Sequence, residues 1–141
     1  MIGLLLPVLF ASNTCFAEDG NRKRGILFPC PSSPNCVSSQ AEKASRRVDP
    51  ILFHGDPASA WSRLRKVIAA MRGARITEEK AGYLRAEFCS ALFGFVDDLE
   101  LLLDKTAKKI DVRSASRTGY FDFGVNRRRV EEIRKRFARE P

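Results

Sequence analysis

The residues best suited to chemistry stand together near the C-terminus, in the segment 113–129, which reads RSASRTGYFDFGVNRRR. An arginine fork matches the geometry of a carboxylate or phosphate group, and the free N–H groups at the start of a helix also bind anions. Three arginines fall where the last helix should begin, although a cation near a helix N-terminus costs about 0.3–1 kcal/mol. Because such local conflicts are often functional sites, we expect this segment to bind an anionic group.

Two sets of residues follow from this segment and from the acidic residues expected beside it. The predicted anion-binding set consists of Ser114, Ser116, Asp122, Asn126, Arg127, Arg128 and Arg129, with Asn126 as the N-cap of the helix. The predicted structural network consists of Asp97, Asp98, Glu100, Arg113 and Arg117. An alternative stays open, in which the aspartates neutralise all of these arginines and fix the last helix to the sheet. In either case Arg127 to Arg129 carry the charge that is hardest to explain internally.

The same residues form a poor catalytic site. Asp97 and Asp98 are neighbours on an expected strand, so they point to opposite faces and cannot share a substrate. The single histidine, His54, should lie at a distant strand end, which leaves Ser114 and Ser116 without a base. We therefore expect a non-enzymatic binding or scaffold module without a cofactor. The alternative is a small hydrolase-like or lyase-like enzyme that uses Asp97 with one of these serines on an anionic or lipid-like substrate.

The cysteines indicate a disulfide. Cys30 and Cys36 flank five residues that include two prolines, which exclude a helix or a central strand. In an exported protein such a pair most often forms a disulfide. Two alternatives remain: a metal site that adds Cys89 and His54, and a redox-active pair. Neither spacing is typical, so no metal is predicted and Cys89 is expected to be a free thiol.

The elements that must position these residues can be read from hydrophobic periodicity. Asp56 and Pro57 mark the start of a helix that ends at Gly73. A short strand within 48–54 precedes it, strands are expected over 74–79, 83–92, 95–104 and 109–118, and a second helix follows Asn126. This order predicts an α+β domain with an antiparallel sheet and two helices packed on one face. It resembles one repeat of the TATA-binding-protein-like fold, or a shortened helix-grip domain.

A four-residue turn over 105–108 would fix the register of the last two strands. Asp104 would then face Lys109, Leu99 would face Ser114, and Asp97 would face Ser116. On the outer face Glu100 would meet Arg113, and Asp98 would lie diagonally between Arg113 and Arg117. Arg113 and Arg117 are therefore expected to be mainly structural.

Composition and the N-terminus suggest a location. Residues 1–17 resemble an export signal, with a short apolar run and a Cys15-Phe16-Ala17 cleavage site, although no basic residue precedes the run. Residues 18–29 read as a linker and 30–141 as one domain. The chain carries a net charge of +8, which favours anionic partners. We expect a periplasmic or cell-envelope protein that binds anionic lipid or envelope polymer, with peripheral membrane association. Nucleic acid is not expected, because the outer sheet face mixes Arg with Glu.

Three separated motifs carry a family resemblance. They are Cys30-Pro-x-x-Pro-Asn-Cys36-Val-Ser-Ser39, Phe95-Val-Asp-Asp98, and the segment from Arg113 to Arg129 with its Gly119, Tyr120, Asp122, Gly124 and Asn126. Together they resemble the domain of unknown function 1499 family over about Cys30 to Phe137. The resemblance implies bacterial envelope or plastid proteins of unassigned activity. It supports export and names neither a ligand nor catalytic residues.

Overall fold

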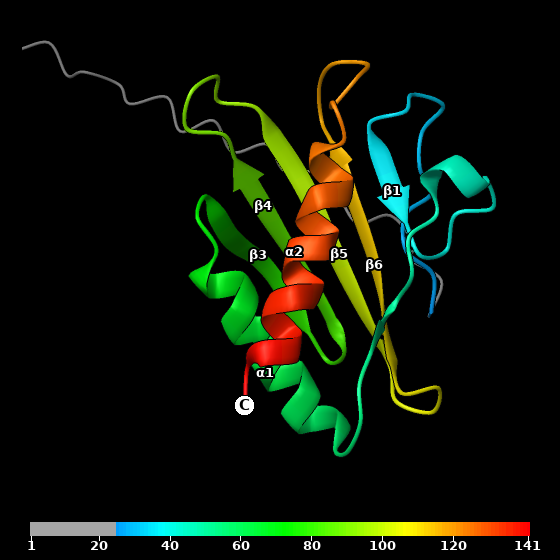
Figure 1. The fold of residues 1–141 in the computed structure, drawn as a ribbon, viewed down its shortest axis with the longest axis vertical. Helices are drawn as coiled ribbons and strands as arrows, with labels where there is room; N and C mark the ends of the chain where they lie inside the picture. Colours follow the sequence, from blue (N-terminus) through cyan, green and yellow to red (C-terminus); the bar gives the residue numbers. More distant parts are fainter. Residues whose placement is uncertain (1–24) are drawn as a thin grey trace, which may run out of the picture.

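Two helices cover one face of an antiparallel sheet in the computed structural model, which describes residues 25–141 (Figure 1). The elements, in chain order, are β1 (Cys36–Ser38), the short 3-10 helix η1 (Ala44–Arg46), β2 (Ile51–Leu52), α1 (Pro57–Ala70), β3 (Ala74–Lys80), β4 (Tyr83–Cys89), β5 (Val96–Asp104), β6 (Lys109–Ser116) and α2 (Val125–Arg139). The predicted α+β class and the packing of both helices on one face are confirmed. The expected export signal and most of the expected linker lie outside the described residues.

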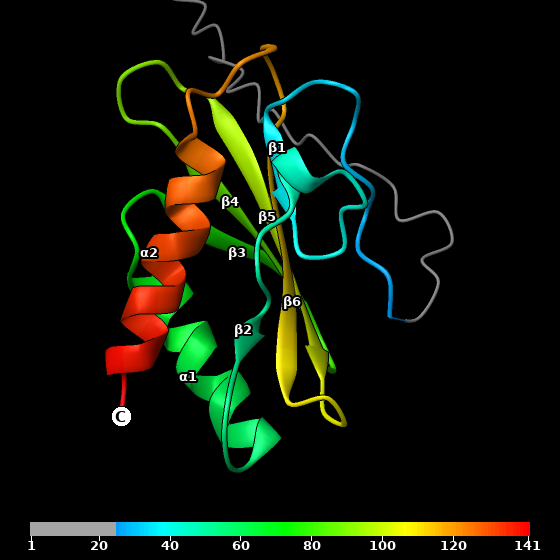
Figure 2. The same cartoon turned by 45° about the vertical axis from the view of Figure 1, so that its right-hand side comes forward.

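The sheet has the strand order β1-β6-β5-β4-β3, and β2 also pairs with β6 (Figure 2). The predicted register of β5 and β6 is correct, with Asp97 opposite Ser116 and Asp104 opposite Lys109. The sequence did not reveal β1, a strand of three residues in which Cys36 lies opposite Ala115 of β6. This short strand brings the cysteine loop beside the segment that leads to α2.

The core lies between the sheet and the helices. Asp56 caps α1, since its carboxylate accepts the Ser59 N–H at 2.8 Å, and Pro57 follows at the first helical position. The buried helix face contributes Leu64 and Ile68 from α1, and Val130, Ile133 and Phe137 from α2. The facing side of the sheet contributes Leu84, Leu99, Leu101, Ile110 and Val112. Each large apolar side chain buried in this way contributes about 1.5–3 kcal/mol, so the core holds α2 firmly against β5 and β6.

Three strands are shorter than predicted at one end of the sheet. The predicted strand 83–92 ends at Cys89, the strand 95–104 begins at Val96, and the strand 109–118 ends at Ser116. A closed turn replaces the first two extensions, because Ser90 N–H donates to the Phe95 carbonyl at 2.9 Å and its hydroxyl accepts the Phe95 N–H at 3.1 Å. The chain therefore leaves this end of the sheet as two loops rather than as longer strands.

Candidate functional site

A cluster of buried polar groups joins β5, β6 and the first turns of α2. Arg129 donates to the Asp97 carboxylate at 2.6 Å, and also to Asn126 Oδ1 at 2.9 Å and to Ser114 Oγ at 3.1 Å. Its guanidinium lies over the Phe88 ring, 4.6 Å from the centroid. Only 13% of the Arg129 side chain and 10% of the Asp97 side chain are exposed. Arg129 therefore ties the last helix to the sheet and faces the interior.

Asn126 lies at the centre of this cluster, fully buried. Its amide oxygen accepts the Ser114 hydroxyl at 2.7 Å, and its amide nitrogen donates to Ser116 Oγ and to the Asp122 carboxylate, both at 2.9 Å. The same nitrogen donates at 3.2 Å to the carbonyl of Asn35, which immediately precedes β1. One side chain thus connects β6, α2 and the cysteine loop.

The prediction that Asn126 is the N-cap is wrong. Gly124 occupies that position with a φ of 77°, and α2 begins at Val125. The capping acceptor is Asp122, whose carboxylate accepts the N–H of Gly124 at 2.9 Å and that of Asn126 at 3.1 Å. Burial alone would raise the pKa of Asp122, but the hydrogen bonds from Asn126 and Gly124 outweigh burial and lower it. Asp122 is thus held as an anion beside the positive end of the helix.

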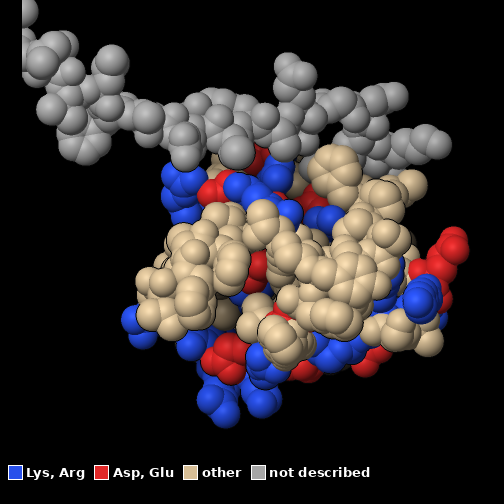
Figure 3. All heavy atoms as spheres, turned by 90° about the horizontal axis from the view of Figure 1, so that it is seen from above, with Lys and Arg blue, Asp and Glu red and all other residues tan. Residues whose placement is uncertain are grey.

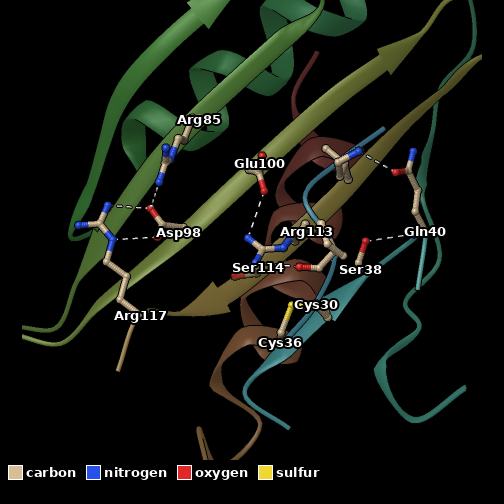
Figure 4. Close-up of polar contacts among 12 residues, drawn as sticks. Cys30, Cys36, Ser38, Gln40, Arg85, Asp98, Glu100, Arg113, Ser114 and Arg117 are labelled. Carbon is tan, nitrogen blue, oxygen red and sulfur yellow. Dashed lines mark hydrogen bonds and ion pairs between the residues drawn. A yellow bond between two sulfur atoms is a disulfide. The ribbon is translucent and has the colours of Figure 1, made fainter. Parts of the chain in front are cut away.

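A second network covers the outer face of the sheet (Figure 4). Arg117 binds both oxygens of Asp98, each at 2.8 Å, and Arg85 donates to the same carboxylate at 3.1 Å. Beside them Arg113 donates at 3.1 Å to Glu100, which is 1% exposed. Burial raises the pKa of Asp98, but the hydrogen bond from Arg117 and the charge of Arg85 outweigh burial and lower it. Both arginine–carboxylate pairs expected from the register are therefore present.

Arg127 and Arg128 differ from the other arginines of the segment. Arg127 donates to the carbonyls of Arg47 and Ser45, each at 3.0 Å, and Arg128 donates to the Phe123 carbonyl at 2.7 Å. Both residues are exposed, and within residues 25–141 their hydrogen-bond partners are carbonyl oxygens rather than carboxylates. Their positive charge therefore stays available at the surface.

The residues of the predicted catalytic alternative are engaged by other side chains. Asp97 is bound to Arg129, and the Ser114 hydroxyl donates to Asn126, so neither is turned toward solvent. A groove of about 730 Å³ lies at the other end of the molecule, among β2, α1 and α2, and His54 lines it together with Arg63, Arg134 and Phe137. The histidine and the serines are thus at different places in the fold.

The cysteines behave as the sequence indicated. Cys30 and Cys36 form a disulfide, with their Cα atoms 5.6 Å apart. Cys36 is buried and pairs with β6, so the disulfide fixes the loop beside Asn35, which contacts Asn126. Because both sulfurs are joined, the alternative metal site would lose two of its four ligands. Cys89 is a free and exposed thiol.

Sequence reasoning missed a set of exposed apolar side chains at the end of the sheet where the two loops emerge. They are Leu92, Phe93 and Phe95 between β4 and β5, and Tyr120, Phe121 and Phe123 between β6 and α2. The signal that could have revealed them is a run of aromatic residues between glycines, outside any strand or helix period.

Among the described residues, no helix is long and apolar enough to cross a membrane.

A family model described as "Protein of unknown function (DUF1499)" matches residues 27–137. No curated protein and no solved structure matches this chain. The matched range includes the disulfide loop, both polar networks and nearly all of α2.

Proposed function

This chain belongs to the DUF1499 family of proteins of unknown function, and we propose that it is an exported, non-enzymatic module that binds anionic groups at the cell-envelope surface. The observation that carries the proposal is the contrast among the arginines of segment 113–129. Arg113, Arg117 and Arg129 are engaged by carboxylates, whereas Arg127 and Arg128 bind carbonyls and stay exposed. The anion-binding surface consists of these last two arginines at the start of α2.

Two features support this surface. The N-terminal end of α2 carries a partial positive charge that adds to the two guanidinium groups. The Arg127 side chain is also held by the carbonyls of Ser45 in η1 and of Arg47 just after it, and the Arg128 side chain by that of Phe123. These contacts lower the entropy lost when the two arginines bind an anion. The overall charge of +8 would favour approach to an anionic surface at low ionic strength.

The test measures binding of the protein to vesicles containing phosphatidylglycerol and to a soluble polyphosphate, over a range of salt concentrations. A basic residue near an anionic surface is worth about 1 kcal/mol, so Arg127→Ala with Arg128→Ala should weaken vesicle binding by about tenfold or more. The matched control is Lys66→Ala with Lys105→Ala, which removes the same charge from exposed positions on α1 and in the β5–β6 turn. This control should lower binding much less.

A second variant separates charge from local structure. Arg127→Lys with Arg128→Lys keeps both charges and removes the guanidinium geometry, so it should retain most of the vesicle binding. Equal binding by the wild type and the double alanine variant, with an unchanged circular dichroism spectrum, would eliminate the proposed site.

A further inference from the structure

We propose, on the basis of the function above, that the anionic partner is a lipid bilayer and that the chain enters its interface with two aromatic loops. The loops span residues 90–95 and 119–124. Their apolar side chains are largely exposed: Leu92 by 81%, Phe93 by 71%, Phe95 by 55%, Tyr120 by 62%, Phe121 by 68% and Phe123 by 89%. Large apolar side chains that gather exposed at one end of a molecule are typical of an interaction surface.

The two loops leave the sheet at the same place. Asp97 lies opposite Ser116, and the Arg117 N–H donates to the Val96 carbonyl at 3.0 Å, so the first residues of β5 adjoin the last residues of β6. Both loops emerge at the upper end of the molecule in Figure 1. Figure 3 looks down on that end, where uncharged side chains form much of the visible surface and Lys and Arg side chains lie around them.

The loop before α2 is held in a conformation that presents its aromatic residues. Phe123 has a φ of 52°, in the left-handed region that bulky side chains rarely occupy. The carboxylate of the neighbouring Asp122 accepts the N–H of Gly124. The carbonyl of Phe123 accepts a hydrogen bond from the Arg128 guanidinium. Strain of this kind persists where the surrounding structure imposes it and is frequent at functional sites. The loop thus fixes the backbone while leaving Phe123 almost entirely in solvent.

The other aromatic residues form ring pairs within each loop. Tyr120 and Phe121 pack edge to face with their centroids 4.8 Å apart, and Phe93 and Phe95 pack at 5.8 Å. Each pair forms the apolar tip of its loop. Such tips are suited to the interface of a bilayer, where peripheral proteins bury Trp, Phe and Leu side chains.

The positive charge beside the loops favours an anionic bilayer. Arg128 donates to the carbonyl of Phe123, so a cation adjoins the most exposed aromatic residue of the part of the chain that the structure describes. Arg127 and Arg128 can remain at the level of the lipid phosphates while the aromatic tips lie deeper. Binding by apolar insertion and by electrostatic attraction would then act together, as in other peripheral proteins. The occupant that this arrangement fits is an anionic membrane surface.

Insertion can be measured with single tryptophan reporters. Phe93→Trp and Phe123→Trp each add one indole to a loop, while Leu52→Trp adds one to an exposed β2 residue near the opposite end of the sheet. The native Trp61, partly buried against the core, is a constant background in all three variants. With vesicles containing phosphatidylglycerol, both loop reporters should shift to shorter emission wavelength and be quenched by brominated acyl chains. The Leu52→Trp reporter should do neither.

A binding measurement with matched variants accompanies the reporters. Phe121→Ser with Phe123→Ser should lower vesicle affinity by about tenfold or more, since burying each ring contributes to partitioning. Leu52→Ser should leave the affinity unchanged, although Leu52 is as exposed as Phe121, at 68%. The same loop variant should still bind soluble polyphosphate, because that binding requires only the arginines.

The outcomes separate this inference from the function on which it rests. Vesicle binding that is salt-sensitive, without quenching of either loop reporter, would overturn insertion and leave anion binding standing. If the wild-type protein binds neither the vesicles nor polyphosphate, the proposed function is wrong as well. Self-association that the Phe121→Ser, Phe123→Ser variant abolishes, without any quenching by lipid, would replace the bilayer with a second copy of this chain.

Discussion

The pair between Arg129 and Asp97 offers a sharp test of which arginines are structural. Arg129→Met keeps a long side chain that can cover Phe88, but removes the donor 2.6 Å from the Asp97 carboxylate. Ser114 and Asn126 still bind each other at 2.7 Å, so the main loss falls on Asp97. Because both side chains of the pair are nearly buried, removing one partner should cost about 3–5 kcal/mol.

Urea unfolding followed by circular dichroism measures this cost. For a domain of this size the loss corresponds to a fall in Tm of about 12–20 °C. A second variant, Asp97→Leu with Arg129→Met, removes both charges together. It should be more stable than Arg129→Met alone, because it leaves no unpaired buried carboxylate.

Two results would refute the reasoning. A loss below about 1 kcal/mol in Arg129→Met would mean that the pair behaves as a solvated surface ion pair. A double variant less stable than the single variant would mean that the charge of Asp97 is stabilised by other groups. Vesicle binding by folded Arg129→Met should equal that of the wild type at low temperature, unlike that of the Arg127→Ala, Arg128→Ala variant. Weaker binding would return Arg129 to the ligand-binding set.

Two further predictions concern the groups that surround α2. The hydrogen bonds to Asp122 outweigh its burial and lower its pKa in the folded state below that of a free aspartate. Its contribution to stability is therefore full above the pKa of the unfolded chain and is lost as the pH falls through the folded pKa. Asp122→Asn should therefore destabilise by about 1–2 kcal/mol at neutral pH and by much less in acid, and a difference independent of pH in urea unfolding would contradict this. Replacing Cys30 and Cys36 by Ser opens a loop of sequence separation 6 and should cost about 2–2.5 kcal/mol by loop entropy. An unchanged urea midpoint would show that the loop is equally restricted without the disulfide.

The sequence was sufficient where a pattern repeats along the chain. Alternation in β5 and β6 specified their register, since a shift of one residue would have buried Asp98 and exposed Leu99. The pairing of Glu100 with Arg113 and of Asp98 with Arg117 follows from that register. These contacts could be predicted because a hairpin with a short turn is a local structure.

Longer-range contacts explain what the sequence did not reveal. The strand β1 has only three residues and exists through its pairing with β6, nearly 80 positions away in the chain. The sequence suggested Asn126 as the helix cap because Asn favours that position. Its side chain instead bonds to Asn35, Ser114 and Ser116, so the residue lies within the first turn of α2 and is buried. No local propensity records such contacts, and Asp122 then takes over the capping role.

The three consecutive arginines show how one helical turn can serve two purposes. Successive residues of a helix point about 100° apart, so Arg127, Arg128 and Arg129 cannot share an environment. Arg129 follows Asn126 by three residues and therefore lies on the same buried face, where Asp97 offsets its charge. Arg127 and Arg128 face solvent, held by carbonyls that orient them without neutralising them. The unfavourable interaction with the helix dipole is thus compensated by Asp97 for Arg129, whereas no carboxylate among the described residues compensates it for Arg127 and Arg128. One of them, Arg128, contacts Phe123, the most exposed aromatic residue described, and this contact connects an uncompensated charge with an exposed apolar surface.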